Sequence, residues 1–441
     1  MVEILESCLV APSEETPKHG LWLSNLDLAA ARGHTPTVYF YRPSGDHNFF
    51  SVEAVKAALS KALVPFYPLQ AVSMWAETAA SRSTATRRAR SSSRHGAITP
   101  STASESSSRR RRRGDCSCDA DSADAPWSCS TILPSSLKTE RSNMQVTFLK
   151  CGGVALGTAM HHFATDGPSA FHFIQTWASL ARGEAADALP PPFLDRTLLR
   201  ARSPPSVVFD HPEYSPDTFS ARSTAPYVAA ILKLSKGQIA LLKSRASGGS
   251  SGYAVSTFRA VTAHVWRCFC VTRKLAPDAQ TRLYLPAQIR NHVKPPLPQH
   301  YFGNALIRVS AVTTVTELVN GSPSFAVEKI KSAVDKVNDV YVRSVIDYLE
   351  LQGKRCMSAR NGVRDTDLWA ISWLGMPMYD ADFGWGLPQF MARAQLYSSG
   401  FLYVTSSPGK DGGVTAVLGL ETENMHRFKD LFYEELSCLQ S

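Results

Sequence analysis

The sequence predicts an α/β protein of two lobes, in which helices flank mixed sheets. Its 441 residues, 44% of them hydrophobic, are enough to form two buried cores. Strand-like and helix-like stretches alternate along most of the chain, which is typical of layered α/β folds. Residues 183–223 are rich in proline and charge and are interpreted as a crossover between two halves. We therefore expect an N-terminal lobe over 1–185, a linker over 186–225 and a C-terminal lobe over 226–441.

The elements of the first lobe follow from the spacing of apolar residues. Apolar side chains between residues 52 and 63 recur at helical spacing, which predicts an amphipathic helix. Pro168 favours the start of another helix because proline is common in the first helical turn. Strands are predicted over 37–41, 145–150 and 154–160, and helices over 52–63 and 168–182.

The second lobe shows the same alternation. The stretch 256–275 is long and amphipathic and predicts a helix that packs on one face. No internal repeat of solenoid length is present. Strands are predicted over 227–234, 400–405 and 413–418, and helices over 236–245, 256–275 and 324–348.

Composition restricts where the protein works. The first twenty residues have neither a basic start nor a continuous apolar run, so we expect no signal peptide. No stretch reaches the roughly eighteen consecutive apolar residues of a membrane span. Nine scattered cysteines suit a reducing compartment better than a disulfide framework. We therefore expect a cytoplasmic protein with no membrane association.

A histidine motif directly follows the predicted strand over 154–160. It reads His161-His162-Phe163-Ala164-Thr165-Asp166-Gly167, so His162 and Asp166 are four residues apart. Histidine is the side chain whose neutral form accepts a proton near pH 7, and a hydroxyl or amine nucleophile needs such a base. The spacing selects His162, the second of the tandem histidines, as the candidate catalytic base.

Other chemistries for these residues fail on spacing. A zinc protease needs HExxH, which the sequence lacks. A serine hydrolase needs GxSxG at a strand-to-helix turn, and the one match, at 248–252, falls between two predicted helices. Cys116 and Cys118 make no credible metal site, and we expect none elsewhere. His264 is interpreted as a helix-packing residue, and His300 as a loop residue.

A second motif, Asp382-Phe383-Gly384-Trp385-Gly386, is a glycine-rich aromatic turn. Together, HxxxD at 162–166 and this DFGWG motif resemble the plant BAHD acyltransferases, and the chain outside 70–144 resembles their hydroxycinnamoyltransferase subfamily. The resemblance implies a two-domain chloramphenicol-acetyltransferase-like fold with an active-site tunnel between the lobes. It also implies transfer of an acyl group, expected to be hydroxycinnamoyl, from coenzyme A to an amine or alcohol in phenylpropanoid metabolism.

The same resemblance assigns roles to individual residues. His162 would remove the proton of the acceptor, and the indole of Trp373 would lie along the tunnel as a donor to the oxyanion. Asp166 would pair with Arg290 and point away from the substrate. The acyl pocket would be lined by Thr35, Thr37 and Tyr39. A structural role is implied for Asp382, Gly384, Trp385 and Gly386.

The acceptor is not specified by these motifs. Members that use shikimate usually carry an arginine two residues after the equivalent of Trp373, and here that position is Gly375. The missing guanidinium favours an amine such as tryptamine, tyramine, putrescine or agmatine, with an alcohol left open. We expect a monomer that binds acyl-CoA and a small acceptor, with acyl-CoA as co-substrate and no bound cofactor.

Residues from about 70 to 144 differ from the rest of the chain. They are rich in serine, arginine, threonine and alanine, include the run 109–113 of arginines and have no apolar periodicity. Twelve Lys/Arg and seven Asp/Glu lie between residues 71 and 143, so this stretch carries five of the nine net positive charges. The remaining charge is ordinary for an enzyme, and we expect no nucleic-acid partner.

The genetic code offers an explanation for this stretch. Permitted codons for residues 72–94, read from one nucleotide earlier, encode RLDVGRDGRLEIDCNAKGALFVA. This peptide resembles the hairpin that the family carries here, so we interpret residues 70–130 as translated out of frame and expect the stretch to be disordered. The alternative function is that of an inactive or misfolded product of a frameshifted or mis-spliced gene.

Overall fold

The computed structural model describes residues 5–17, 21–31, 33–46, 48–70, 143–215, 225–247, 254–353, 363–409 and 411–437. Apart from Gln70, the segment interpreted as out of frame, 70–130, lies outside these ranges. The last two residues of the unusual stretch 70–144 are described, because strand β2 begins at Asn143, two residues before the predicted start.

The described helices and strands follow the chain in a regular alternation. The helices are α1 (Asn25–Ala29), α2 (Val52–Ala62), α4 (Gly167–Ala181), α5 (Lys236–Ala246), α6 (Thr257–Thr272), α7 (Val315–Asn320), α8 (Pro323–Asp335), α9 (Asp339–Gln352) and α11 (Thr422–Glu434). The strands are β1 (His34–Tyr41), β2 (Asn143–Phe148), β3 (Val154–His161), β4 (Tyr227–Leu234), β5 (Gln280–Gln288), β6 (Leu306–Thr314), β7 (Leu368–Ser372), β8 (Phe390–Arg393), β9 (Phe401–Ser406) and β10 (Val414–Glu421).

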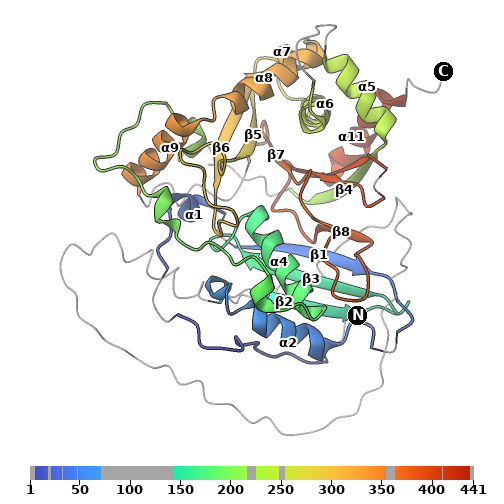
Figure 1. Ribbon diagram of the computed structural model, residues 1–441. Helices are drawn as coiled ribbons and strands as arrows, with labels where there is room; N and C mark the ends of the chain where they lie inside the picture. Colours follow the sequence, from blue (N-terminus) through green and yellow to red (C-terminus); the bar gives the residue numbers. More distant parts are fainter. Residues whose placement is uncertain are drawn as a thin grey trace.

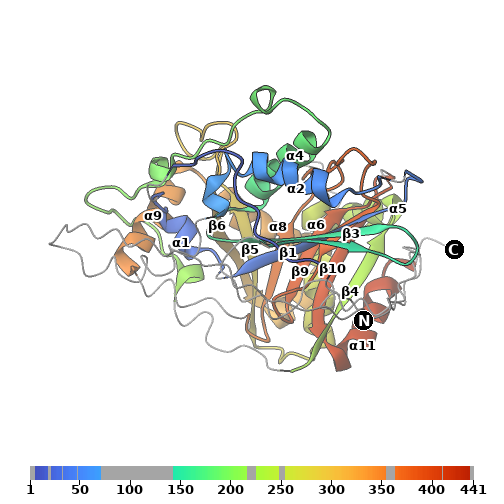
Figure 2. The same ribbon diagram turned by 90° about the horizontal axis from the view of Figure 1, so that it is seen from below.

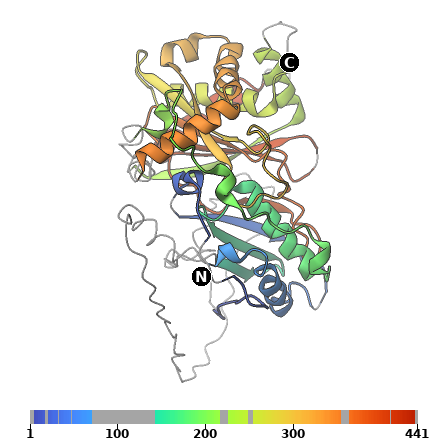
Figure 3. The same ribbon diagram turned by 60° about the vertical axis from the view of Figure 1, so that its left-hand side comes forward.

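Two sheets form the two lobes seen in Figure 1, and Figure 3 shows the lobes stacked one above the other. A four-stranded sheet has the order β2-β3-β1-β8, and a six-stranded sheet has the order β4-β10-β9-β7-β5-β6. The larger sheet is mixed. Strand β7 runs parallel to both β5 and β9, whereas β4 with β10, β10 with β9 and β5 with β6 pair antiparallel. Mixed sheets flanked by helices confirm the predicted two-lobe α/β fold.

In the first lobe, α2 and α4 lie side by side along the four-stranded sheet (Figures 1 and 2). The indole of Trp177 on α4 is fully buried and donates to the carbonyl of Val55 on α2 at 2.9 Å. Asp166 forms the N-cap of α4, because its carboxylate accepts from the backbone N–H of Ser169 at 3.1 Å. The cap therefore fixes the backbone at Asp166, four residues after His162.

One strand of the small sheet comes from the C-terminal half of the chain. Strand β8 pairs antiparallel with β1, and Arg393 lies opposite Thr37. The predicted lobe boundaries place 390–393 in the C-terminal lobe, and those boundaries stay a prediction. The pairing ties the two halves together beside the cavity described below.

The helical prediction over 324–348 differs from the structure. Two helices, α8 and α9, occupy this stretch, and Asn338 separates them. The Asn338 side chain accepts from the backbone N–H of Tyr341 at 3.0 Å, so it begins a new helix. Strand 227–234, by contrast, coincides with β4.

None of the helices in the described ranges is long and apolar enough to cross a bilayer.

Candidate active site

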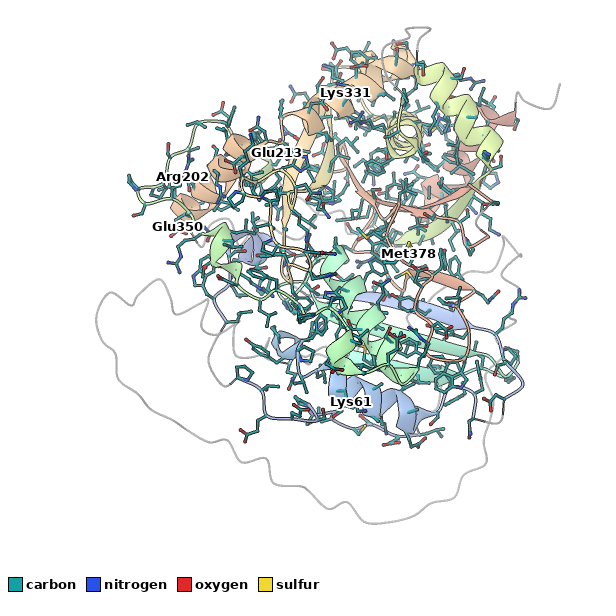
Figure 4. The ribbon with its side chains drawn as sticks, in the orientation of Figure 1. Lys61, Arg202, Glu213, Lys331, Glu350 and Met378 are labelled. Carbon is teal, nitrogen blue, oxygen red and sulfur yellow. The ribbon has the colours of Figure 1, made fainter. Side chains whose placement is uncertain are left out.

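A cavity of about 760 Å³ lies between the two lobes. Strands β1 and β3 and helix α4 line it from the first lobe, and β5, β6, β7, β9 and α8 line it from the second. Figure 4 places Met378 where the lobes meet, with Lys61 and Lys331 on the outer helices α2 and α8. The cavity has the position of the tunnel that the sequence predicted.

His162 lines this cavity at the end of β3. Its backbone N–H donates to the carbonyl of Gly33 at 3.0 Å, so the hydrogen bonding between β1 and β3 continues one residue past the strand. Its Nδ1 lies 3.1 Å from Oδ1 of Asn304, and none of the described residues is hydrogen-bonded to Nε2. Nε2 is therefore the ring nitrogen available to a molecule in the cavity.

The orientation of Asn304 is determined by a buried carboxylate. Its Nδ2 donates to Oδ1 of Asp27 at 3.0 Å and to the carbonyl of His162 at 2.8 Å. Both partners only accept, so this atom is the amide nitrogen and the atom facing His162 is the amide oxygen. A neutral His162 must then carry its proton on Nδ1, which leaves a lone pair on Nε2.

Asp27 is in turn held by a buried cation. Nη1 of Arg196 lies 3.2 Å from Asp27 Oδ1, and neither side chain is exposed. Arg196 also donates to the carbonyls of Phe163 and Ala164, at 3.2 and 2.7 Å. Gly303 has a φ of +157°, and a Cβ there would lie 2.9 Å from the Arg196 guanidinium. Only glycine allows this close approach.

Burial lowers the pKa of His162 below its ordinary value of 6.5. The carbonyl of His162, the negative charge of Asp166 and the Asn304 hydrogen bond act in the opposite direction, while the positive charge of Arg393 adds to the lowering. The imidazole is consequently neutral at physiological pH, the form that accepts a proton.

Asp166 pairs with Arg290 and not with His162. Nη1 and Nη2 of Arg290 lie 2.7 and 2.9 Å from the two carboxylate oxygens. The backbone N–H groups of Ser169 and Ala305 complete the set at 3.1 Å each. Burial alone would raise the pKa of Asp166, but the Arg290 charge and these hydrogen bonds hold it below its usual value. The carboxylate is ionised and fully hydrogen-bonded.

The predicted pocket residues are brought together on one wall. Thr35, Thr37 and Tyr39 all line the cavity, because alternate residues of β1 point to the same face. Thr37 is hydrogen-bonded to Thr158 across the sheet at 2.6 Å. Trp373 lines the cavity from the end of β7. A mainly apolar wall thus carries several hydroxyl groups.

Trp373 is nearly buried between two aromatic rings. Phe171 and Tyr403 contact it edge-on, with ring centroids 6.1 and 5.2 Å away. Gly375, for which the resemblance implied a missing shikimate-binding arginine, is not among the cavity-lining residues, whereas Met376 is. Gly375 has a φ of +77°, so a side chain there would also strain the backbone.

The DFGWG turn lies outside the cavity. Asp382 accepts from the backbone N–H groups of Gly384 and Gly386 at 2.8 and 3.0 Å, and both glycines have a φ of +101°. The Trp385 ring packs on Phe50 with centroids 5.2 Å apart. The turn is therefore anchored to the first lobe through aromatic packing.

Two other histidines, His264 and His300, have the positions that the sequence predicted. His264 is buried on α6, where its Nε2 lies 2.9 Å from the Phe432 carbonyl. His300 lies in a loop with a φ of +62°. Within the described ranges, no cluster of three or more His, Cys, Asp or Glu is placed to hold a metal ion.

Several residues of the site were not assigned by the sequence. Asn304 belongs to the stretch 301–304 that was matched to the family, but no contact with His162 was predicted for it. A polar asparagine within an otherwise apolar stretch was the available signal. No local pattern pointed to Asp27, Arg196 or Arg393, or to Tyr397, which also lines the cavity.

A model of the Transferase family matches residues 1–75 and 129–435, so the chain belongs to this family, the BAHD acyltransferases that the motifs predicted. The protein is an acyltransferase. Putrescine hydroxycinnamoyltransferase 1 of Oryza sativa subsp. japonica is 45% identical, over 99% of this chain and 100% of its own length. Shikimate O-hydroxycinnamoyltransferase of Nicotiana tabacum is 35% identical, over 98% and 99%.

Solved structures of low sequence identity share the fold. Vinorine synthase superposes with a TM-score of 0.68 at 20% identity, covering 99% of this chain and 98% of its own. TRI101 of F. sporotrichioides, complexed with coenzyme A and T-2, also has a TM-score of 0.68, at 16% identity over 93% and 96%. The alternative of an inactive or misfolded product is not supported by these similarities.

Proposed function

We propose that His162 is the general base in a direct transfer of a hydroxycinnamoyl group from coenzyme A to an amine or alcohol. The observation that carries the proposal is the orientation of the imidazole. Nδ1 is committed to Asn304, so Nε2 presents a lone pair to the cavity. Burial lowers the pKa of the ring and keeps it neutral.

The reaction follows from this arrangement. Nε2 of His162 takes the proton as the acceptor nitrogen or oxygen attacks the thioester carbonyl. The carbonyl oxygen gains negative charge, and the indole N–H of Trp373 is proposed as its donor. When the C–S bond breaks, the imidazolium returns the proton to the departing thiolate. The products are the acylated acceptor and free coenzyme A, without an acyl-enzyme.

Other site residues have supporting roles in this proposal. Asp166 and Arg290 maintain the backbone around His162 through their ion pair. Thr35, Thr37 and Tyr39 would form the wall of the acyl pocket. The turn that contains Asp382, Gly384, Trp385 and Gly386 would brace the first lobe from outside the cavity.

We favour an amine acceptor. The rice relative is named for putrescine, and Gly375 replaces the arginine that shikimate users carry. An alcohol is the second candidate because the tobacco relative is named for shikimate. An amine must reach His162 unprotonated, since an ammonium has no lone pair with which to attack.

The test is turnover by the full chain with p-coumaroyl-CoA and a panel of putrescine, agmatine, tyramine, tryptamine and shikimate. His162→Gln should reduce kcat by at least about a hundredfold. His161→Gln is the matched control, since His161 is the neighbouring histidine and does not line the cavity. Turnover by His162→Gln at the parental rate would overturn the mechanism.

We also propose that residues 70–130, most of which the family model does not match, are translated out of frame. The family match ends at residue 75 and resumes at residue 129, which supports a boundary at each end of the unusual composition. Sequencing the transcript across codons 68–146 is the test. A continuous frame that encodes the arginine-rich stretch would contradict the proposal.

The remaining expectations concern the cellular setting. We propose a monomer that acts in the cytoplasm, in phenylpropanoid metabolism. Relatives named for hydroxycinnamoyl transfer support the metabolic setting. Light scattering of the purified chain and cell fractionation would test the other two statements.

A further inference from the structure

Arg393 contributes to the cavity wall a cation that has no carboxylate partner among the described residues. It ends β8 opposite Thr37 of β1, and directly opposed residues of antiparallel strands extend to the same face of a sheet. Arg393 and Thr37 accordingly both line the cavity. The guanidinium lies over the rings of Tyr397 and Tyr403, at 4.4 and 5.0 Å from their centroids.

The hydrogen bonding of this guanidinium is incomplete. Nε donates to the carbonyl of Gln395 at 3.1 Å. Nη2 is buried but has no hydrogen-bond partner, and no described carboxylate lies within ion-pair distance of Arg393. A buried donor without a partner is costly, and a guanidinium without a counter-ion more so. A purely structural arginine would leave this cost unexplained, whereas a ligand oxygen would remove it.

The surroundings of Nη2 indicate which oxygen fits. The guanidinium lies over two tyrosine rings, so an aromatic ligand whose oxygen reaches Nη2 has rings to pack against. The nearby wall holds the hydroxyl pair of Thr35 and Tyr397, 3.3 Å apart, and the apolar side chain of Met391. This largely apolar and aromatic wall, with the unsatisfied donor Nη2, suits an aromatic ring that carries a hydroxyl group.

We propose that Arg393 is a specificity-determining residue, whose Nη2 donates to the ring hydroxyl of the hydroxycinnamoyl group. This inference rests on the proposed function, in which the same wall of β1 holds the acyl group. Phenol-bearing acyl groups are then preferred over unsubstituted ones, because the latter leave Nη2 buried without a partner.

The experiment compares kcat/KM for p-coumaroyl-CoA and cinnamoyl-CoA, which differ only in the ring hydroxyl. The parent enzyme should prefer p-coumaroyl-CoA by about 10- to 100-fold. Arg393→Met, which keeps the length of the side chain but has no donor, should reduce this ratio to about one while still turning over cinnamoyl-CoA. Gln395→Ala is the control, because the backbone carbonyl that holds Nε is unchanged, and it should keep the parental ratio.

The outcomes separate this inference from the proposed function. Failure of the parent to use either thioester would contradict the proposed function itself. Turnover of both with the same ratio in parent and Arg393→Met would overturn the role of Arg393. A change confined to the KM of the acceptor would assign Arg393 to the acceptor and likewise overturn the proposal. If Arg393→Met does not fold, Arg393→Gln, with a shorter donor, should give an intermediate ratio.

Discussion

The carboxylate of Asp166 faces Arg290 and turns away from His162, although Asp166 and His162 are only four residues apart. Both Arg290 terminal nitrogens bond to the carboxylate, at 2.7 and 2.9 Å, while Nδ1 of His162 is engaged by Asn304. The HxxxD motif therefore does not form a His–Asp dyad. Its two polar residues take part in separate networks, and these networks predict different consequences of substitution.

Asp166→Asn should reduce stability, because it leaves the guanidinium of Arg290 without its counter-ion. We expect a loss of about 3–5 kcal/mol in the free energy of unfolding, measured by urea denaturation. The pKa of Asp166 is lowered in the folded state. Its contribution to stability is therefore fully present above pH 3.8, the ordinary pKa, and is lost as the pH falls below that value.

The matched control for this prediction is Asp382→Asn, which alters a half-buried carboxylate with no ion-pair partner among the described residues. Asp382→Asn should lose less free energy of unfolding than Asp166→Asn. The double variant Asp166→Asn/Arg290→Met should recover part of the stability. Parental stability in Asp166→Asn, with activity abolished, would indicate a chemical role and contradict this interpretation.

Asn304→Ala should impair catalysis, because without the amide oxygen the proton of His162 is no longer held on Nδ1. We expect kcat to fall by about 10- to 100-fold with little change in KM. Nitrogen-15 NMR of the histidine rings should show Nδ1–H in the parent and a mixture of tautomers in the variant. Ser24→Ala is the control, because Ser24 contacts the other oxygen of Asp27, at 2.8 Å, and not the amide. An unchanged ring spectrum in Asn304→Ala would show that the amide does not select the tautomer.

The acidic limb of the kcat/KM profile should have its midpoint below pH 6.5, because burial lowers the pKa of His162. Charged groups that act on the ring are Asp166, which opposes the lowering, and Arg393, which adds to it. Arg393→Met should therefore move the midpoint upward. The measurement requires an acceptor that does not titrate between pH 4.5 and 8, and a parental midpoint at or above 6.5 would refute the prediction.

Gly384→Ala and Gly386→Ala should each cost about 1–3 kcal/mol, because both positions have a φ of +101°. Space is not the reason, since a Cβ at Gly384 would have its nearest neighbour at 3.7 Å and one at Gly386 none within 4 Å. Gly237→Ala is the control, with ordinary helical backbone and a nearest atom at 3.8 Å. Thermal unfolding should show losses for the first two only; equal midpoints for all three would mean that the turn tolerates the strain.

Local sequence determined much of the secondary structure. The strand over 227–234 matches β4, and the helix over 52–63 matches α2 to within one residue, because apolar spacing of a single element is a local property. The HxxxD spacing also located His162, which lies on the cavity. Strands β5 and β6 were not predicted, although they form the outer edge of the larger sheet.

By itself, the sequence determined the two-lobe α/β class, the family and the position of the histidine. Only the tertiary structure decided the partners of that histidine. Asn304 contacts His162, which is 142 residues away in the sequence, and Asp27, which is 277 residues away. Strand β8 likewise pairs with β1 across most of the chain. Apolar periodicity reports which face of an element is buried, but not which distant polar group it meets there. The direction of the Asn304 amide and the unsatisfied donor of Arg393 depend on such long-range contacts. The tautomer of His162 and the proposed acyl selectivity could therefore be inferred only from the tertiary structure.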